Sequence, residues 1–186
     1  MKKILTILIS TLLICLIIIF TALKSQSSPT ITEALQKRGI KVHTIVNEKD
    51  VDGGKVIVFT QKDISDKGFT LYSEYVKKTL FGWKSIDGER GGHGGNEQIS
   101  SGYFKFDNKI RLTTGYVADS DILKVNVEID DNIVNPEMIM INNVRLWVLY
   151  IENSIDPMKI NVIGKTKKGN IVRNIDLTRF ISLTSN

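Results

Sequence analysis

An uninterrupted apolar run near the amino terminus is the strongest pattern in the chain. It extends over residues 4–23 without a charged residue and follows Lys2 and Lys3. Twenty residues of helix are about 30 Å long, which matches the hydrocarbon thickness of a bilayer. Basic residues that precede such a run stay on the cytoplasmic side. We therefore predict that residues 1–24 are a membrane anchor or signal segment and that the rest of the chain is extracytoplasmic.

Two interpretations of this segment stay open. Retention as a single-pass anchor in the cell membrane is favoured by length, since a secretory signal has a shorter apolar region of about 7 to 15 residues. Cleavage near Ser27 with secretion is the alternative, because Ser25 and Ser27 are small residues with the spacing that a cleavage site requires.

The polar and apolar pattern changes after this segment. Residues 25–30 form a short polar linker, and Thr30 and Glu33 then have the spacing of a capping box. Gly39 is placed to end a helix of about two turns over residues 31–38. From there to residue 186 the helical signals fade, and we treat 31–186 as one β-rich domain.

Short runs of β-branched and aromatic residues, separated by turn residues, fill that domain. The clearest alternation is in residues 122–129, where Leu123, Val125 and Val127 are predicted to face a core and the intervening side chains to face water. Other strands are expected at 41–46, 55–60, 69–79, 81–86, 103–106, 110–117, 138–141, 144–151, 159–163 and 170–175. The fold class predicted is mainly β, an antiparallel sandwich or strongly curved sheet with one short N-terminal helix, preceded by a single transmembrane helix.

Charge argues against nucleic acid as a partner. The net charge is +5, and Lys2, Lys3 and Lys24 carry three of these charges, which leaves +2 on the exported part. Basic residues are interleaved with acidic ones there, apart from Lys165, Lys167 and Lys168, which we interpret as a solvated hairpin turn.

Candidate chemistry is sparse. The single cysteine, Cys15, lies in the apolar run, so the domain forms no internal disulfide and we expect packing to stabilise it. His43 is interpreted as an ordinary strand residue, and we predict no cofactor, no metal site and no catalytic residue. Acidic residues at 119, 121, 130 and 131 are interpreted as turn residues, with a cation site as the lesser alternative.

A glycine-rich segment is the most unusual local feature. We hypothesise that Gly91, Gly92, His93, Gly94 and Gly95 form an exposed connection that binds a partner, because glycines let a backbone approach a ligand closely.

Trp83, in the preceding Leu-Phe-Gly-Trp-Lys run, completes the predicted binding site. It is interpreted either as core packing or as a partly exposed aromatic contact for the same partner.

Three runs carry a resemblance to known proteins. They are residues 54–59 (Gly-Lys-Val-Ile-Val-Phe), residues 78–84 (Lys-Thr-Leu-Phe-Gly-Trp-Lys) and residues 145–147 (Arg-Leu-Trp). In these runs the chain resembles small, uncharacterised membrane-anchored proteins of spore-forming Gram-positive bacteria. The resemblance implies an extracytoplasmic location at the bacterial envelope and carries over no catalytic residue.

Taken together, the sequence predicts a binding or interaction protein of the envelope, with the membrane and an envelope protein or cell-wall component as partners. A carboxylate-dependent exported hydrolase and an accessory or sensor subunit of a membrane complex are the alternatives.

Overall fold

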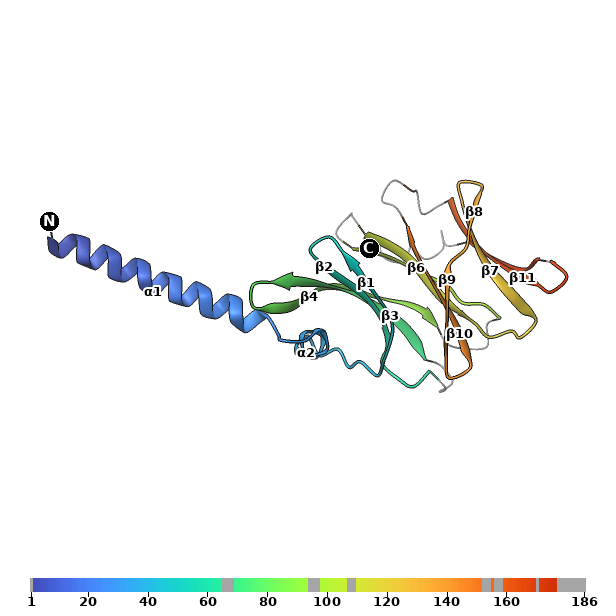
Figure 1. Cartoon of the computed structure of the whole chain (residues 1–186), viewed down its shortest axis with the longest axis horizontal. Coiled ribbons are helices and arrows are strands. Elements are labelled where there is room, and N and C mark those ends of the chain that lie inside the picture. Colours follow the sequence, from blue (N-terminus) through green and yellow to red (C-terminus); the bar gives the residue numbers. More distant parts are fainter. Residues whose placement is uncertain are drawn as a thin grey trace.

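A computed structural model gives the structure of the protein. It describes residues 2–64, 69–93, 98–106, 110–151, 155, 159–169 and 171–176. The chain begins with a long helix, α1 (Lys2–Gln26), which projects away from a body of β-sheet (Figure 1). A helix of two turns, α2 (Ile31–Lys37), lies between α1 and the sheets.

Helix α2 begins and ends as its sequence predicts. The side chain of Thr30 accepts a hydrogen bond from the backbone N–H of Glu33 at 3.2 Å, which is one half of a capping box. Gly39 follows the helix with φ +77°, a left-handed conformation that favours glycine.

Twelve antiparallel strands form three four-stranded sheets among the described residues. Sheet A has the order β1-β2-β3-β4, sheet B the order β5-β6-β10-β9, and sheet C the order β12-β11-β7-β8. The strands are β1 (Thr44–Val51), β2 (Gly54–Thr60), β3 (Thr70–Thr79), β4 (Gly82–His93), β5 (Gly102–Phe106), β6 (Ile110–Val117), β7 (Ile122–Ile129), β8 (Asn132–Val134), β9 (Glu137–Ile141), β10 (Val144–Ile151), β11 (Ile160–Thr166) and β12 (Ile171–Asp176).

Sheet B is buried on both faces, which explains the continuous apolar run of β10. Leu146 and Val148 point to one side, where they join apolar residues of sheet A, among them Val58 and Leu71. Trp147 points to the other side and joins apolar residues of sheet C. Alternate residues of one strand therefore enter two different cores.

Trp147 is the largest fully buried side chain and occupies the core between sheets B and C. Gly115 lies opposite it on β6, and a Cβ atom at Gly115 would come within 2.8 Å of the Trp147 ring. The glycine thus provides the space that the indole fills.

A third apolar cluster joins α2 to the outer face of sheet A. Ala34 and Leu35 of the helix pack with Ile57, Phe59 and Val76 of the sheet. Because α2 covers this face, β2 and β3 are buried on both sides over much of their length.

The mainly β, antiparallel prediction is confirmed, and most of the expected strands lie within a few residues of their predicted bounds. The first expected strand, 41–46, begins later, so that the exposed His43 precedes β1 instead of lying in a strand. A short strand, β8, was not predicted. It follows a tight turn in which Asp130 and Asp131 have φ 48° and 64°, the conformation of a two-residue hairpin turn.

The predicted alternation in β7 is wrong at its start and at Asn126, which is buried and donates a side-chain hydrogen bond to Asn135 instead of facing water. Lys165 pairs with Lys124 whereas Thr166 pairs with Ile122, so Leu123 is the extra residue of a β-bulge. Ile122 is consequently fully buried, and Leu123 is 50% exposed. The bulge shifts the alternation by one residue, so that Ile122 faces the core and Leu123 faces solvent.

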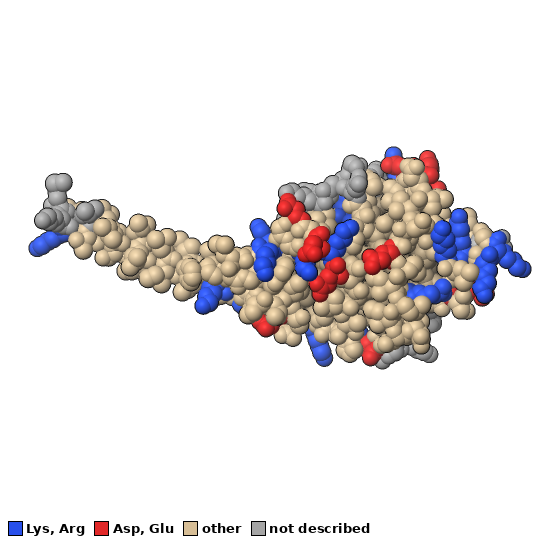
Figure 2. All heavy atoms as spheres, viewed as in Figure 1, with Lys and Arg blue, Asp and Glu red and all other residues tan. Residues whose placement is uncertain are grey.

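Helix α1 is apolar and uncovered. Residues Thr6–Gln26 form one helix that is long and apolar enough to cross a membrane, and none of its most apolar window is buried. Figure 2 shows this helix almost without charge between its ends, whereas basic and acidic residues are spread over the β-domain.

Candidate functional site

The end of α1 is docked on the turn between β3 and β4. Ser28 and Trp83 exchange backbone hydrogen bonds in an isolated antiparallel bridge, with N to O distances of 2.8 and 2.7 Å. Ser27 and Ser28 are both buried. The segment predicted as a polar linker is therefore a fixed connection, because the hairpin supplies backbone partners that its sequence does not reveal.

Gly82 allows the backbone of Ser28 to approach the hairpin closely. Its φ is +117°, and a Cβ atom at this position would come within 2.2 Å of the carbonyl oxygen of Ser28. Both the backbone conformation and the close approach require glycine.

Polar side chains reinforce the bridge. The hydroxyl groups of Ser27 and Thr79 are 2.9 Å apart, and the Nζ atom of Lys84 donates to the side-chain oxygen of Gln26 at 2.6 Å. Lys37 of α2 donates to the carbonyl oxygen of Ser27 at 3.1 Å. Three elements, α1, α2 and the β3–β4 hairpin, thus meet at one junction.

An aromatic contact extends the junction along the helix. The ring of Phe81 lies edge-to-face against Phe20, with 4.7 Å between ring centroids. Leu80, at the tip of the same turn, is 97% exposed. The turn therefore presents two large apolar side chains beside the last turns of α1.

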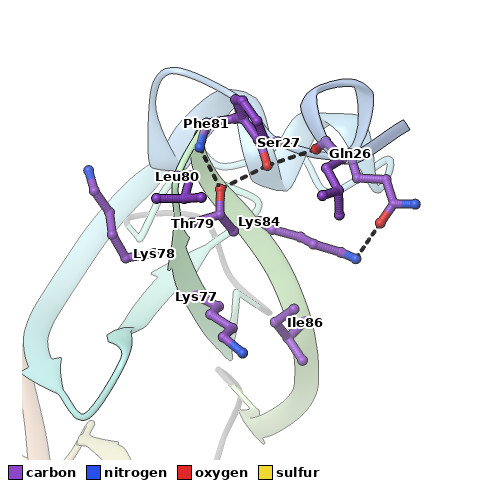
Figure 3. A pocket seen from close by; sticks show the side chains of 10 residues that line it. Gln26, Ser27, Lys77, Lys78, Thr79, Leu80, Phe81, Lys84 and Ile86 are labelled. Carbon is purple, nitrogen blue, oxygen red and sulfur yellow. Dashed lines mark hydrogen bonds between the residues drawn. The ribbon is translucent and has the colours of Figure 1, made fainter. Parts of the chain in front are cut away.

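A pocket of about 380 Å³ lies between the helix end and the hairpin (Figure 3). Its apolar lining includes Leu23 and Ile86, and its polar lining includes three lysines. The full set is Leu23, Gln26, Ser27, Lys77, Lys78, Thr79, Leu80, Phe81, Lys84 and Ile86, which contains no acidic residue. The pocket therefore combines apolar walls with net positive charge.

Trp83 is partly buried, which agrees with the packing interpretation, and its role as a contact for a partner stays a prediction. Its ring is half-buried against the cluster that joins α2 to sheet A. The Nζ atom of Lys78 lies 4.3 Å from the centroid of the same ring, within the range of a cation–π interaction. Trp83 therefore contributes to packing and also lies beside a cation at the junction.

The glycine-rich segment begins as a strand, which corrects the prediction of a loop. Strand β4 continues to His93, with Leu71 paired to Gly91 and Thr70 paired to His93. Backbone hydrogen bonds to β3 need no side chains, so a glycine-rich sequence can still form a ladder. Gly94 and Gly95 lie outside the described residues, and the binding role of the segment stays a prediction.

A buried carboxylate beneath α2 was not predicted. Glu74 of β3 is almost fully buried, and its side chain accepts hydrogen bonds from Arg38 and Ser85. Gly88 pairs with Glu74 and leaves room for the carboxylate, since a Cβ atom there would overlap it. Burial raises the pKa of Glu74, and the charge of Asp87 acts in the same direction, whereas Ser85 and Arg38 oppose the rise.

No sequence signal marked Glu74, because it occupies an ordinary polar position in an alternating strand. Its burial follows from α2, which covers that face of sheet A. The Glu74 group links the helix to the sheet through the Arg38 ion pair. Its surroundings are those of a structural contact.

The acidic residues considered as a cation site are turn residues at opposite ends of β7. Asp119 accepts a hydrogen bond from the backbone N–H of Asp121 before the strand, and Asp130 forms an ion pair with Lys159 at 2.6 Å after it. Within the described residues no group of three or more acidic, histidine or cysteine side chains could hold a metal ion.

The basic group near the carboxyl terminus is a hairpin turn at Lys167 and Lys168, as predicted, whereas Lys165 belongs to strand β11. Lys167 and Lys168 lie between β11 and β12, and Gly169 follows with φ +79° and donates a backbone hydrogen bond to Thr166 at 2.9 Å. This turn lies at the end of the β-domain remote from α1 (Figure 1).

No family model, curated protein or solved structure matches this chain.

Proposed function

We propose that the protein is a membrane-anchored binding or interaction protein whose β-domain lies outside the cytoplasm at the bacterial envelope. The observation that carries this proposal is helix α1, which is long and apolar enough to span a bilayer and exposes its apolar side chains along its length. Apolar surface of this extent is stable in lipid and unfavourable in water. The two lysines at its start favour a cytoplasmic amino terminus.

The β-domain suits a recognition role because its described strands form a scaffold of three sheets that positions the turns between them. We describe it as a β-sandwich extended to three sheets. This description is supported by the two apolar clusters, one between sheets A and B and one between sheets B and C.

The docked junction supports retention of α1. Ser27 and Ser28 are buried against the β3–β4 hairpin, so the backbone near the candidate cleavage site is held in hydrogen bonds. Cleavage at this site would have to break the bridge between Ser28 and Trp83. Retention leaves the β-domain fixed at the membrane surface.

Cysteine labelling in intact cells tests location and orientation. In a Cys15→Ser background, Lys168→Cys should react with a membrane-impermeant maleimide without permeabilisation. The matched variant Lys3→Cys should react only after the membrane is opened. Reaction of both variants, or of neither, in intact cells would contradict the proposed topology.

The mass of the purified chain tests retention. We expect the protein in the membrane fraction at the mass of the full sequence. Recovery from the medium of a chain that begins near Ser28 would show that cleavage occurs and that the anchor is wrong.

A further inference from the structure

We propose that the β3–β4 hairpin is a second membrane contact, in which Leu80 and Phe81 enter the apolar layer beside α1 and nearby lysines bind the phosphate groups of anionic phospholipids. This inference rests on the proposed function, because it requires α1 to be inserted in a bilayer. It adds a lipid-binding site to an anchor that is otherwise a single helix.

The contact between Phe81 and Phe20 determines the depth of the hairpin. Phe20 lies inside the apolar run, four residues before Lys24, which corresponds to about 6 Å along the helix axis. The two rings are 4.7 Å apart at their centroids. When α1 spans a bilayer, Phe81 therefore lies below the level of the lysine that ends the apolar run.

Leu80 has the exposure expected of a side chain whose partner is lipid. It is 97% exposed, whereas the most exposed other large apolar side chains among the described residues of the β-domain, Met140 and Ile171, are each 63% exposed. Transfer of such a side chain from water to an apolar layer is favourable. Its neighbour Phe81 is already placed at the depth of that layer.

Positive charge surrounds the apolar tip. Lys77, Lys78 and Lys84 line one pocket with Leu80 and Phe81, and no acidic residue lines it. None of the ion pairs among the described residues uses these three lysines. Lysines at this level of a membrane attract anionic headgroups, and Trp83 beside Lys78 is an aromatic residue suited to the interface.

The pocket has room for one lipid headgroup. Its volume is about 380 Å³, and its apolar walls include Leu23 of α1 and Ile86 of β4. Figure 3 shows the lysine side chains extending from both strands of the hairpin. An amphiphile with a phosphate group and an acyl chain matches this lining better than a soluble anion, which would leave the apolar walls unpartnered.

Fluorescence depth measurements on the full chain in phospholipid vesicles test the insertion. A polarity-sensitive fluorophore is attached to Leu80→Cys or to Lys168→Cys, each in a Cys15→Ser background. In a third sample it is attached to Cys15 of the natural chain. We expect nitroxide-labelled lipids to quench the labels at 15 and 80, and aqueous iodide to quench the label at 168.

The three positions separate the hypotheses. Lipid quenching at 15 without lipid quenching at 80 would overturn the hairpin contact and leave the anchor intact. Aqueous quenching at both 15 and 80 would overturn the anchor and, with it, the hairpin contact. Lipid quenching at both positions supports the proposal.

Headgroup binding is tested with nanodiscs of phosphatidylglycerol and of phosphatidylcholine. We expect the full chain to melt at a higher temperature in the anionic discs, and the triple variant Lys77→Gln, Lys78→Gln, Lys84→Gln to lose most of this difference. The matched control Lys124→Gln, Lys165→Gln, Lys167→Gln removes the same charge far from α1 and should retain it. An equal difference in both triple variants, or none in the natural chain, would overturn the lysine site.

Discussion

The core between sheets B and C and the junction between α1 and the β3–β4 hairpin are held together by different forces. In the core, Trp147 packs against apolar side chains that come from strands far apart in the sequence. At the junction, the elements are connected by a backbone bridge between Ser28 and Trp83, a few polar side-chain contacts and one aromatic contact. The stability of the core depends on buried apolar area, and the stability of the junction depends on backbone hydrogen bonds and on the close approach at Gly82.

This difference determines how each region responds to substitution. Loss of apolar volume in a core removes transfer free energy and leaves a cavity, so its cost is large. Loss of a partly exposed hydrogen bond costs less, since water replaces the partner. A strained backbone position at the junction is the exception, because there the substitution itself must be accommodated.

The largest effect is expected at Trp147. Trp147→Ala should lower the free energy of unfolding by about 3 to 5 kcal/mol, since the indole is fully buried between two sheets. Denaturant titration in detergent micelles measures it. Trp83→Ala, which removes a half-buried ring at the junction, should cost about 1 to 2 kcal/mol. Equal costs would show that the junction is as strongly packed as the core.

The β-bulge in β7 gives a neighbouring pair with opposite expectations. Ile122→Ala should cost about 2 to 5 kcal/mol because Ile122 is fully buried. Leu123→Ala should cost about 0.5 kcal/mol or less because that side chain lies at the surface. Unfolding curves of the two variants provide the comparison, and the reverse order would place the register shift elsewhere.

At the junction, Gly82→Ala should cost about 1 to 3 kcal/mol, through backbone strain at φ +117° and overlap with the Ser28 carbonyl oxygen. Hydrogen exchange should show faster exchange of the Ser28 and Trp83 amides. Gly169→Ala is the control, because its φ is +79° with open space around it. That variant should show the strain without any change at the junction amides.

The smallest effect is a pH dependence from Glu74. Its folded-state pKa is raised above the ordinary value of 4.5, chiefly by burial. The stability that this group contributes is therefore fully present below about pH 4.5 and is lost as the pH rises through the raised pKa. Relative to Glu74→Gln, the natural chain should melt at progressively lower temperature over that interval.

The Arg38→Gln variant sharpens this test. The Arg38 cation lowers the pKa of Glu74, so its removal should raise that pKa further and extend the pH interval upward. A natural chain that gains stability over Glu74→Gln as the pH rises would show that the ion pair outweighs burial.

Much of the β architecture could be predicted from local pattern. Strands β6, β7 and β10 have the bounds that alternation and turn residues indicate. Asn142 and Asn143 form the turn between β9 and β10, with φ 48° and 64°. The division into three sheets could not be predicted, because it depends on which strands pair at long range. The bulge at Leu123 was hidden for the same reason, since only the partner strand β11 fixes the register.

The candidate site was predicted only in part. The run around Gly82 indicates either core packing or a partner contact for Trp83, and the structure shows the packing. The contact of Phe81 with Phe20 joins residues in separate elements, so no local pattern contains it. Glu74 was missed because its burial is created by α2 and by the absence of a side chain at Gly88.

The bridge between Ser28 and Trp83 has a mechanical consequence. A flexible linker would let the β-domain rotate relative to α1. Here backbone hydrogen bonds and the contact between Phe20 and Phe81 join α1 and the β-domain as one rigid unit. Rotation of α1 about its own axis would therefore turn the whole domain through the same angle. Within the proposed topology, a membrane protein that binds α1 inside the bilayer would therefore fix the direction, in the plane of the membrane, in which the turn at Lys167 and Lys168 points.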